Sequence, residues 1–134
     1  MSISLAQLDT SKASEVPFEF NLLDESGSDT GVILKIIGSS AEKVKSEVKK
    51  TLNQVRQKAA MRQASRQAGK TVVEYTTIEE DIEIEVRLSA VRVVGWNLSE
   101  ECNADNIDKL CRMSAFYRDQ IVGNSNNLSN FMKL

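Results

Sequence analysis

Few residues in this chain could bind a metal or form a covalent bond. Two cysteines, Cys102 and Cys111, lie nine positions apart, and the sequence contains no histidine. Zinc sites are built mainly from cysteine and histidine, so one here would need carboxylates or a second chain. Because no basic, apolar leader opens the sequence, we expect a reducing cytosol, where disulfides do not persist. The sequence therefore predicts two free thiols and no metal or other cofactor.

The absence of histidine also limits catalysis. Histidine is the usual proton carrier near neutral pH, and it activates most serine and cysteine nucleophiles. The sequence contains neither a phosphate-binding loop nor a glycine-rich dinucleotide motif. Carboxylates and lysines are present, but no spacing singles out a catalytic set among them. The sequence therefore favours a binding protein over an enzyme.

The distribution of charge is more informative. Eight lysines or arginines and one acid lie from Lys43 to Arg66, whereas six acids and no base lie from Glu74 to Glu85. Such blocks are often solvated helix faces. Blocks of opposite sign also suit head-to-tail self-association of copies, and both interpretations remain open. The candidate self-association residues are Lys43, Lys49, Arg56, Arg62, Arg66, Glu79, Glu80 and Glu83.

The bulk composition is typical of one globular domain. The chain has 134 residues, of which 41% are hydrophobic and 27% charged, and its formal net charge is −2. No apolar run approaches the roughly 18–20 residues that cross a bilayer, so we expect no membrane partner. The basic segment 43–66 could bind nucleic-acid phosphates, but it has no interleaved aromatic residues and an acidic segment follows it. Nucleic-acid binding is therefore the weaker alternative.

Secondary structure elements must position the charged blocks, and the first two along the chain are expected to be an arm and a hairpin. Residues 1–16 are small and polar, and they are expected to form a flexible arm. Residues 17–38 alternate in "PFEFNLL", continue through the turn-forming "DESGSDTG" and end in "VILKIIG". This pattern predicts an antiparallel hairpin, whose apolar face needs helices against it.

Residues 39–69 carry the basic block and are expected to form a long amphipathic helix. The stretch "SSAE" matches a capping box, in which Ser39 and Glu42 bond to each other's backbone NH groups. Apolar residues recur at helical spacing as far as Ala59, after which the apolar face fades. We therefore expect this helix to leave the core, run into solvent and end near Gly69.

Residues 77–95 allow two interpretations. Strict alternation over 82–90 is typical of a strand. Against this, Thr77 and Glu80 match a second capping box, and acids crowd the first turn, where a helix dipole favours them. We favour a mostly buried helix that ends at Gly95.

Trp96 is the only tryptophan of the chain, and it ends the apolar run "VVGW". Its large ring and single NH group suit a position with one dry edge and one polar edge. Two roles remain open: packing in a core against Phe116, Tyr117 or Phe131, which we favour, and contact with a partner protein. Residues 103–134 are expected to form the C-terminal helices.

These elements together predict the α+β class. We expect an N-terminal antiparallel β-hairpin packed on a mainly α-helical domain of about four helices. Residues 17–134 would form this single domain, and residues 1–16 would form the arm outside it.

Four stretches, taken in order, carry a resemblance to a known family. They are "SLAQLDTSKASEVPFEF", "LLDESGSDTGVILKIIGSSAEKVK", "SAVRVVGWNL" and "NADNIDKLCRMSAFYRDQIV" followed by "NLSNFM". The order of these features resembles the tail assembly chaperones of long-tailed bacteriophages. The features are a leucine-bearing arm, a strand that begins with Thr-Gly, an apolar segment that ends in Gly-Trp, and an aromatic-Arg-x-Gln motif. The chain departs from relatives at Ser114-Ala115, where a proline is frequent, and in the charge-rich residues 77–85.

The resemblance implies a protein without catalytic residues that binds the long, largely helical tape measure protein. It would keep that partner soluble in the host bacterial cytoplasm until tail tube subunits polymerise around it, and it would be absent from the mature virion. A longer form made by ribosomal frameshifting would recruit the tail tube protein, and this chain would be the unshifted form. Many weakly bound copies along one polymer gain from effective concentration, which agrees with the expected self-association.

Two other functions remain open from the sequence. One is a permanent structural or tail-completion protein of the virion, which would share the hairpin, the helices and the charges. The other is a nucleic-acid-binding protein that uses the basic helix.

Overall fold

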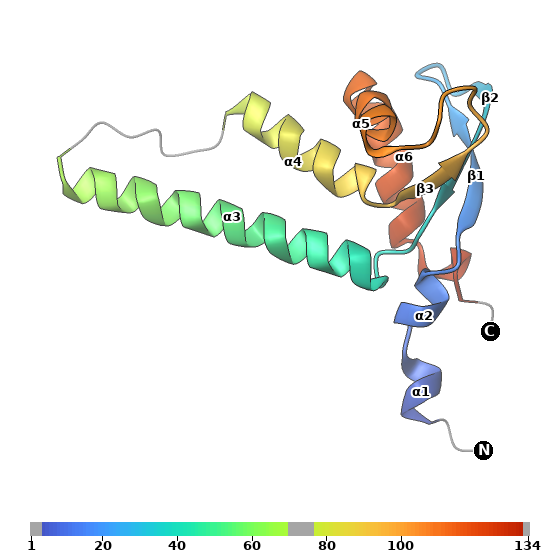
Figure 1. Ribbon diagram of the computed structural model, residues 1–134, viewed down its shortest axis with the longest axis horizontal. Helices are drawn as coiled ribbons and strands as arrows, with labels where there is room; N and C mark the ends of the chain where they lie inside the picture. The colour runs from blue at the N-terminus through green and yellow to red at the C-terminus, as the bar shows by residue number, and fades with distance from the viewer. Residues whose placement is uncertain (1–3, 70–76, 133–134) are drawn as a thin grey trace.

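The computed structural model describes residues 4–69 and 77–132 (Figure 1), so Glu74 of the acidic block and both chain ends lie outside the described residues. The predicted α+β class is confirmed, with three strands where the hairpin predicted two. The elements are α1 (Leu5–Leu8), α2 (Ser11–Ser14), β1 (Phe18–Leu23), β2 (Asp29–Ile36), α3 (Glu42–Gln67), α4 (Ile78–Ala90), β3 (Val93–Trp96), α5 (Ala104–Met113), α6 (Ala115–Asn126) and the 3-10 helix η1 (Leu128–Asn130).

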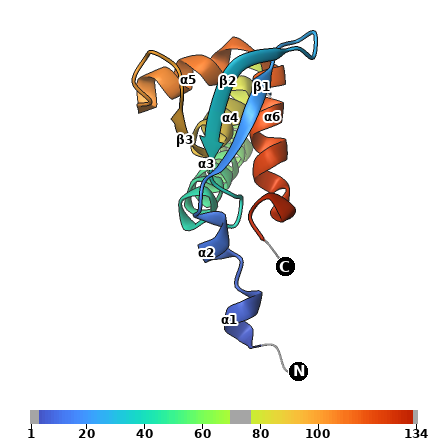
Figure 2. The ribbon, with the colours of Figure 1, turned by 90° about the vertical axis from the view of Figure 1, so that its right-hand side faces the viewer.

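Two parts of the chain project from a small body made of the sheet, α5 and α6. Figure 1 shows α3 and α4 as a helix pair that extends to one side of this body, and α1 and α2 below it. Figure 2, turned by 90°, shows α1 again at the end of the molecule away from α5. No helix in the described ranges is long and apolar enough to cross a membrane.

The sheet has the order β1-β2-β3, with both neighbours antiparallel to β2. Alternation along the hairpin separates its faces as predicted. Leu34 is buried on the inner face, whereas Glu19 and its cross-strand partner Lys35 form a 3.6 Å ion pair on the outer face. The hairpin turn forms because Asp24 Oδ1 accepts hydrogen bonds from the backbone NH groups of Ser26 and Ser28.

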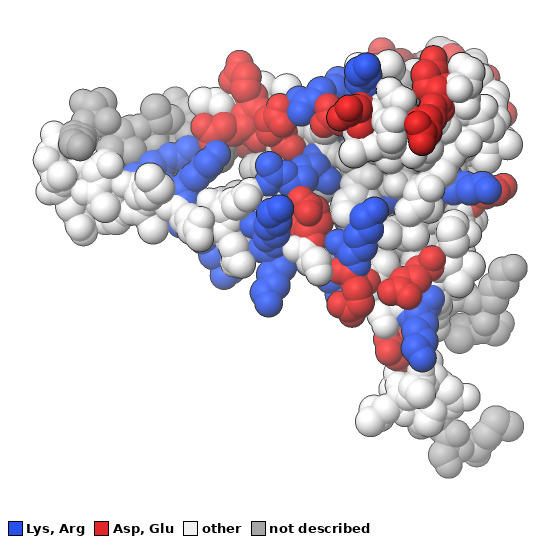
Figure 3. All heavy atoms as spheres, in the orientation of Figure 1, with Lys and Arg blue, Asp and Glu red and all other residues white. Residues whose placement is uncertain are grey.

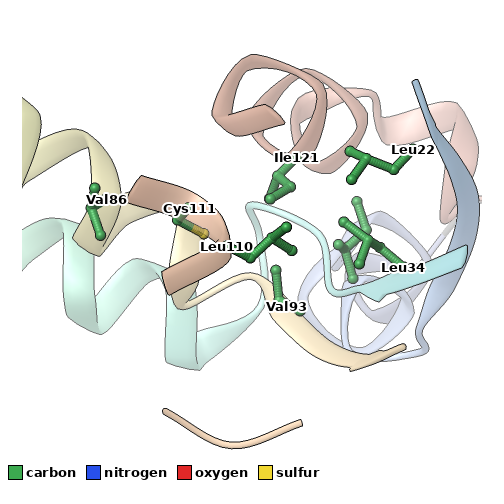
Figure 4. Close-up of a cluster of buried hydrophobic side chains, with 8 residues drawn as sticks. Leu22, Leu34, Val86, Val93, Leu110, Cys111 and Ile121 are labelled. Atoms are coloured by element: carbon green, nitrogen blue, oxygen red, sulfur yellow. The ribbon is translucent and has the colours of Figure 1, made fainter. Parts of the chain in front are cut away.

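The core lies between the inner face of the sheet and the helices. Side chains from six elements converge there (Figure 4), so one cluster holds α4, α5 and α6 against the sheet, whereas Val44 of α3 packs in a separate small cluster with Ile37 and Ala41. Its buried members are Leu22, Leu34, Ile36, Val86, Val93, Leu110, Cys111 and Ile121.

Helix α4 decides between the two interpretations of residues 82–90 in favour of the helix. The expectation of a mostly buried helix is wrong, because Val86 and Ser89 are the only buried residues of α4 and its outer face meets solvent. As predicted, Thr77 is its N-cap, and the Oγ1 of Thr77 accepts a hydrogen bond from the backbone NH of Glu80. The helix ends at Ala90, however, and not at Gly95, because the next residues form β3 against the free edge of β2. Gly95 pairs with Lys35 of β2, and a Cβ at Gly95 would lie 3.1 Å from the Lys35 Cδ, so glycine leaves room for the lysine side chain across the pair.

The predicted capping box at the start of α3 is wrong. The helix begins at Glu42 with Ala41 as N-cap and without a side-chain cap. Ser39 instead donates a hydrogen bond to Asn126 Oδ1 at the end of α6, and its hydroxyl lies 3.4 Å from that of Ser125. A tertiary partner therefore competes successfully with the local cap.

Candidate functional site

The structure brings one pair of the predicted self-association residues together within a single chain. Arg62 of α3 and Glu80 of α4 form a half-buried ion pair, with 3.2 Å between Nη2 and Oε2. Glu83 pairs instead with Arg112 of α5, whose guanidinium donates two hydrogen bonds to the Glu83 carboxylate at 2.5 and 2.9 Å. These contacts hold the projecting helix pair together and anchor it to the body.

The remaining predicted basic residues lie on the exposed surface of α3. Lys43, Lys49 and Arg56 are exposed, as is Arg66 near the end of the helix. Glu79 is exposed on α4. Figure 3 shows basic side chains along the lower side of α3 and acidic side chains over α4. Apart from the Arg62–Glu80 pair, these exposed charges of α3 and α4 lie on the outer surface of the helix pair, where contact with another copy is possible.

A groove of about 500 Å³ lies along this basic surface. Val48 and Leu52 supply its apolar lining, and Leu52 is 51% exposed although it belongs to the apolar stripe of α3. No acid lines the groove among the described residues. Four cations line it: Lys45, Lys49, Arg56 and Arg92. This basic groove suits an apolar side chain flanked by acids.

Arg92 is a buried cation at the inner end of the basic groove. Its Nε donates to the Ser125 hydroxyl at 3.0 Å, and its Nη1 donates to the carbonyl oxygen of Leu88 in the last turn of α4. Burial lowers the pKa of the guanidinium. A cation at a helix C-terminus is favoured by the helix dipole, so Arg92 stabilises the end of α4.

Trp96 forms one wall of a second groove, of about 410 Å³, at the other end of the sheet. Its Nε1 donates to the carbonyl oxygen of Glu100 at 2.8 Å, and its ring packs on the core cluster. Apolar and aromatic side chains dominate the lining of this groove, which we call the tryptophan groove. They are Leu22, Val32, Trp96, Leu98, Leu110, Met113 and Tyr117.

The three aromatic residues expected around Trp96 are separated by the fold. Tyr117 shares the tryptophan groove and packs on the same cluster. Phe131 packs edge-on against Phe18, with 5.9 Å between ring centroids, and Phe116 is 37% exposed. Trp96 therefore combines a core contact with an exposed edge.

Arg118 has a structural role that sequence reasoning did not identify. Its buried guanidinium donates to Glu85 Oε2 from Nε and Nη2 at 3.2 and 3.0 Å, and from Nη1 to the carbonyl oxygen of Cys111 at 2.9 Å. It thereby links α4, α5 and α6. The aromatic-Arg-x-Gln step in the sequence was the available signal, but only packing shows what the arginine contacts.

Both cysteines are free thiols. Cys111 is buried in the core and Cys102 is half-buried, and burial raises the pKa of each thiol. Raised pKa values make thiols less reactive, because the thiolate is the nucleophile and the metal ligand. Within residues 4–69 and 77–132, no cluster of cysteine and acidic side chains could hold a metal ion.

Comparison with protein-family models identifies a match over most of the chain. The family model described as "Phage tail assembly chaperone" matches residues 1–124, which is nearly the whole chain. No curated protein and no solved structure matches the chain significantly.

Proposed function

Since the chain belongs to the phage tail assembly chaperone family, we propose that it binds the tape measure protein and keeps it soluble during tail assembly. Tail tube subunits would polymerise around that complex, recruited mainly by a longer, frameshifted form of the chaperone. The proposed site of action is the host bacterial cytoplasm, and the protein would be absent from the mature virion. The family match over residues 1–124 carries this proposal.

The basic groove is the proposed surface for the tape measure protein. A long helical partner exposes apolar seams that aggregate unless they are covered. Val48 and Leu52 would cover part of such a seam, and Lys45, Lys49 and Arg56 would select segments flanked by acids. The proposed activity is binding without catalysis, and it needs no cofactor.

Self-association is the second part of the proposal. Each copy offers a small contact area, so many copies along one partner are needed to cover it. Exposed Lys43, Lys49 and Arg56 on α3 and exposed Glu79 on α4 are the proposed charged contacts between copies. Contacts of this kind weaken with salt, so we expect the oligomers to become smaller as the ionic strength is raised.

Co-expression with the tape measure protein tests the binding proposal. We expect the tape measure protein to remain soluble and to co-purify with the chain. Leu52→Asp should reduce the amount of tape measure protein that co-purifies. The new carboxylate removes apolar lining from the groove and repels the acidic residues of the proposed partner. Met61→Asp is the matched control, since Met61 is also exposed on α3 but does not line the groove. If the solubility of the tape measure protein does not depend on the chain, the binding proposal is wrong.

Purified virions test the alternative of a permanent tail protein. Mass spectrometry of the particles should detect the tape measure and tube proteins but no copy of this chain. A stoichiometric amount of the chain in the particles would favour the structural alternative.

A further inference from the structure

Helix α1 presents two leucines that contact no core. Leu5 and Leu8 lie one turn apart and are 87% and 64% exposed, and no residue of α1 is buried. Ser4 and Gln7 cap the helix, with the Ser4 backbone NH donating to Gln7 Oε1 at 2.9 Å. Isolated helices shorter than about 12–15 residues are marginal in water. An apolar stripe on so short a helix therefore needs a surface to pack on.

The base of this arm is fixed, which gives α1 a direction. Ser14 of α2 is buried, and its carbonyl oxygen accepts a hydrogen bond from the backbone NH of Gly38 at 2.7 Å. A Cβ on Gly38 would lie 2.8 Å from the Ser14 Cβ, so glycine permits this close approach. Beyond this anchor, α1 points away from the body in Figures 1 and 2.

The tryptophan groove lies at the opposite end of the molecule. Its walls come from β3, α5 and the adjoining parts of the sheet and α6, and both ribbon views place α5 far from α1. Met113 on its rim is 70% exposed. A volume of about 410 Å³ lies in the range of roughly 300–1,000 Å³ that is typical of ligand pockets. The groove is therefore large enough for apolar side chains from outside the chain.

We propose that Leu5 and Leu8 of one copy insert into the tryptophan groove of the next copy. Charges at the two surfaces agree with this pairing. Asp9 follows the two leucines, while Lys109 lines the groove; Lys12 lies farther along the arm, and Glu100 also lines the groove. Charge pairs of this kind at a rim fix register more than they add affinity.

The contact joins two different surfaces at opposite ends, so it is heterologous. A heterologous contact repeats from copy to copy and produces a ring or an open chain instead of a closed two-fold dimer. The inference rests on the self-association proposed above and adds an apolar joint to the charged contacts. It predicts that some assembly remains at high salt, because salt screens the exposed charges but does not weaken the apolar joint.

Two sets of variants at exposed positions test the joint by analytical ultracentrifugation. The double variant Leu5→Ser with Leu8→Ser removes the insert, and Met113→Lys blocks the groove. In salt high enough to screen the exposed charges, both should sediment as monomers at concentrations where the wild-type chain still forms oligomers. Met61→Lys is the matched control, because Met61 is also 70% exposed but lies on α3, and it should assemble like wild type. Unchanged circular dichroism spectra would show that all variants fold.

Mixing the two defective variants gives the sharper result. The Met113→Lys copy retains its arm, and the double-serine copy retains its groove, so the mixture should form dimers that grow no further. A mixture that stays monomeric, or single variants that assemble like wild type, would overturn the joint. If wild type assembles and the variants do too, the failure is limited to this inference. A wild-type chain that is monomeric at every concentration and every salt concentration would contradict the proposed self-association as well. The proposed binding to the tape measure protein is tested independently, by the co-expression experiment.

Discussion

The side chain of Gln120 makes two hydrogen bonds with the backbone of Leu23. Its Nε2 donates to the Leu23 carbonyl oxygen, and its Oε1 accepts from the Leu23 NH, each at 2.8 Å. The carboxamide thus takes the place of a neighbouring strand at the end of β1, where the pairing with β2 shifts register between Asn21 and Leu23. This contact holds α6 against the sheet.

Gln120→Ala should lower the free energy of unfolding by about 1–3 kcal/mol, because it leaves a half-buried NH and carbonyl without partners. Gln120→Glu should also destabilise the fold, since the carboxylate can accept from the Leu23 NH but has no donor for the Leu23 carbonyl oxygen. Urea denaturation followed by circular dichroism measures both. Asp119→Ala, at the exposed neighbouring position, is the control, and an equal loss in that variant would argue against the assigned contact.

Arg118→Lys should destabilise the protein although it keeps the charge. Lysine has no planar fork, so it cannot bond to Glu85 and to the Cys111 carbonyl oxygen at once. We expect the free energy of unfolding to fall by about 1–3 kcal/mol, mainly because the buried Cys111 carbonyl oxygen loses its hydrogen-bond donor. The exposed Arg112→Lys exchange serves as the comparison in the same denaturation experiment. A smaller loss for Arg118→Lys than for Arg112→Lys would contradict this reasoning.

Trp96→Ala should lower the free energy of unfolding by about 3 kcal/mol, at the low end for tryptophan truncations because the ring is only half-buried. Trp96→Phe keeps most of the apolar contact and loses the hydrogen bond to Glu100, so about 1 kcal/mol is expected. Chemical denaturation gives both values. A Trp96→Ala variant that unfolds like wild type but no longer assembles would assign the ring wholly to the partner contact.

The ion pair of Glu83 and Arg112 predicts a loss of stability in acid. Hydrogen bonds from Arg112 hold the pKa of Glu83 below its ordinary value of 4.5. A carboxyl with a lowered folded-state pKa stabilises the fold above its unfolded-state pKa, and that contribution is lost as the pH falls through the folded-state pKa. The melting temperature of wild type should therefore fall below about pH 4.5 more steeply than that of Glu83→Gln. Parallel curves for the two proteins would show that the pair contributes nothing.

The strongly periodic elements could be predicted from sequence because local pattern and tertiary contact agree there. Phe18, Phe20 and Leu22 alternate with polar residues and do face the core side of the hairpin. Thr77 caps α4 as its local sequence predicted, with its hydroxyl accepting from the Glu80 NH. The short strand β3 could not be predicted, since its pairing partner is the free edge of β2, which only the folded chain presents.

The candidate site was predictable only in part. Sequence reasoning identified the opposed charges of α3 and α4, but which of them meet within one chain depends on how the helices pack. Arg62 and Glu80 are 18 positions apart, and Glu83 and Arg112 are 29 apart, so local spacing carries no signal for either pair. The tryptophan groove was missed for the same reason, because its walls come from segments far apart in the sequence.

The close approach of Ser14 to Gly38 has a mechanical consequence. The arm and α3 both leave the body at this point, where Ser39 and Ser125 also meet. Small residues that pack closely together therefore lie where the two projections meet and help to set the angle between them. A filament of copies linked through their arms would inherit its pitch from that angle, so a single added methyl group at Gly38 would change the curvature of the whole filament.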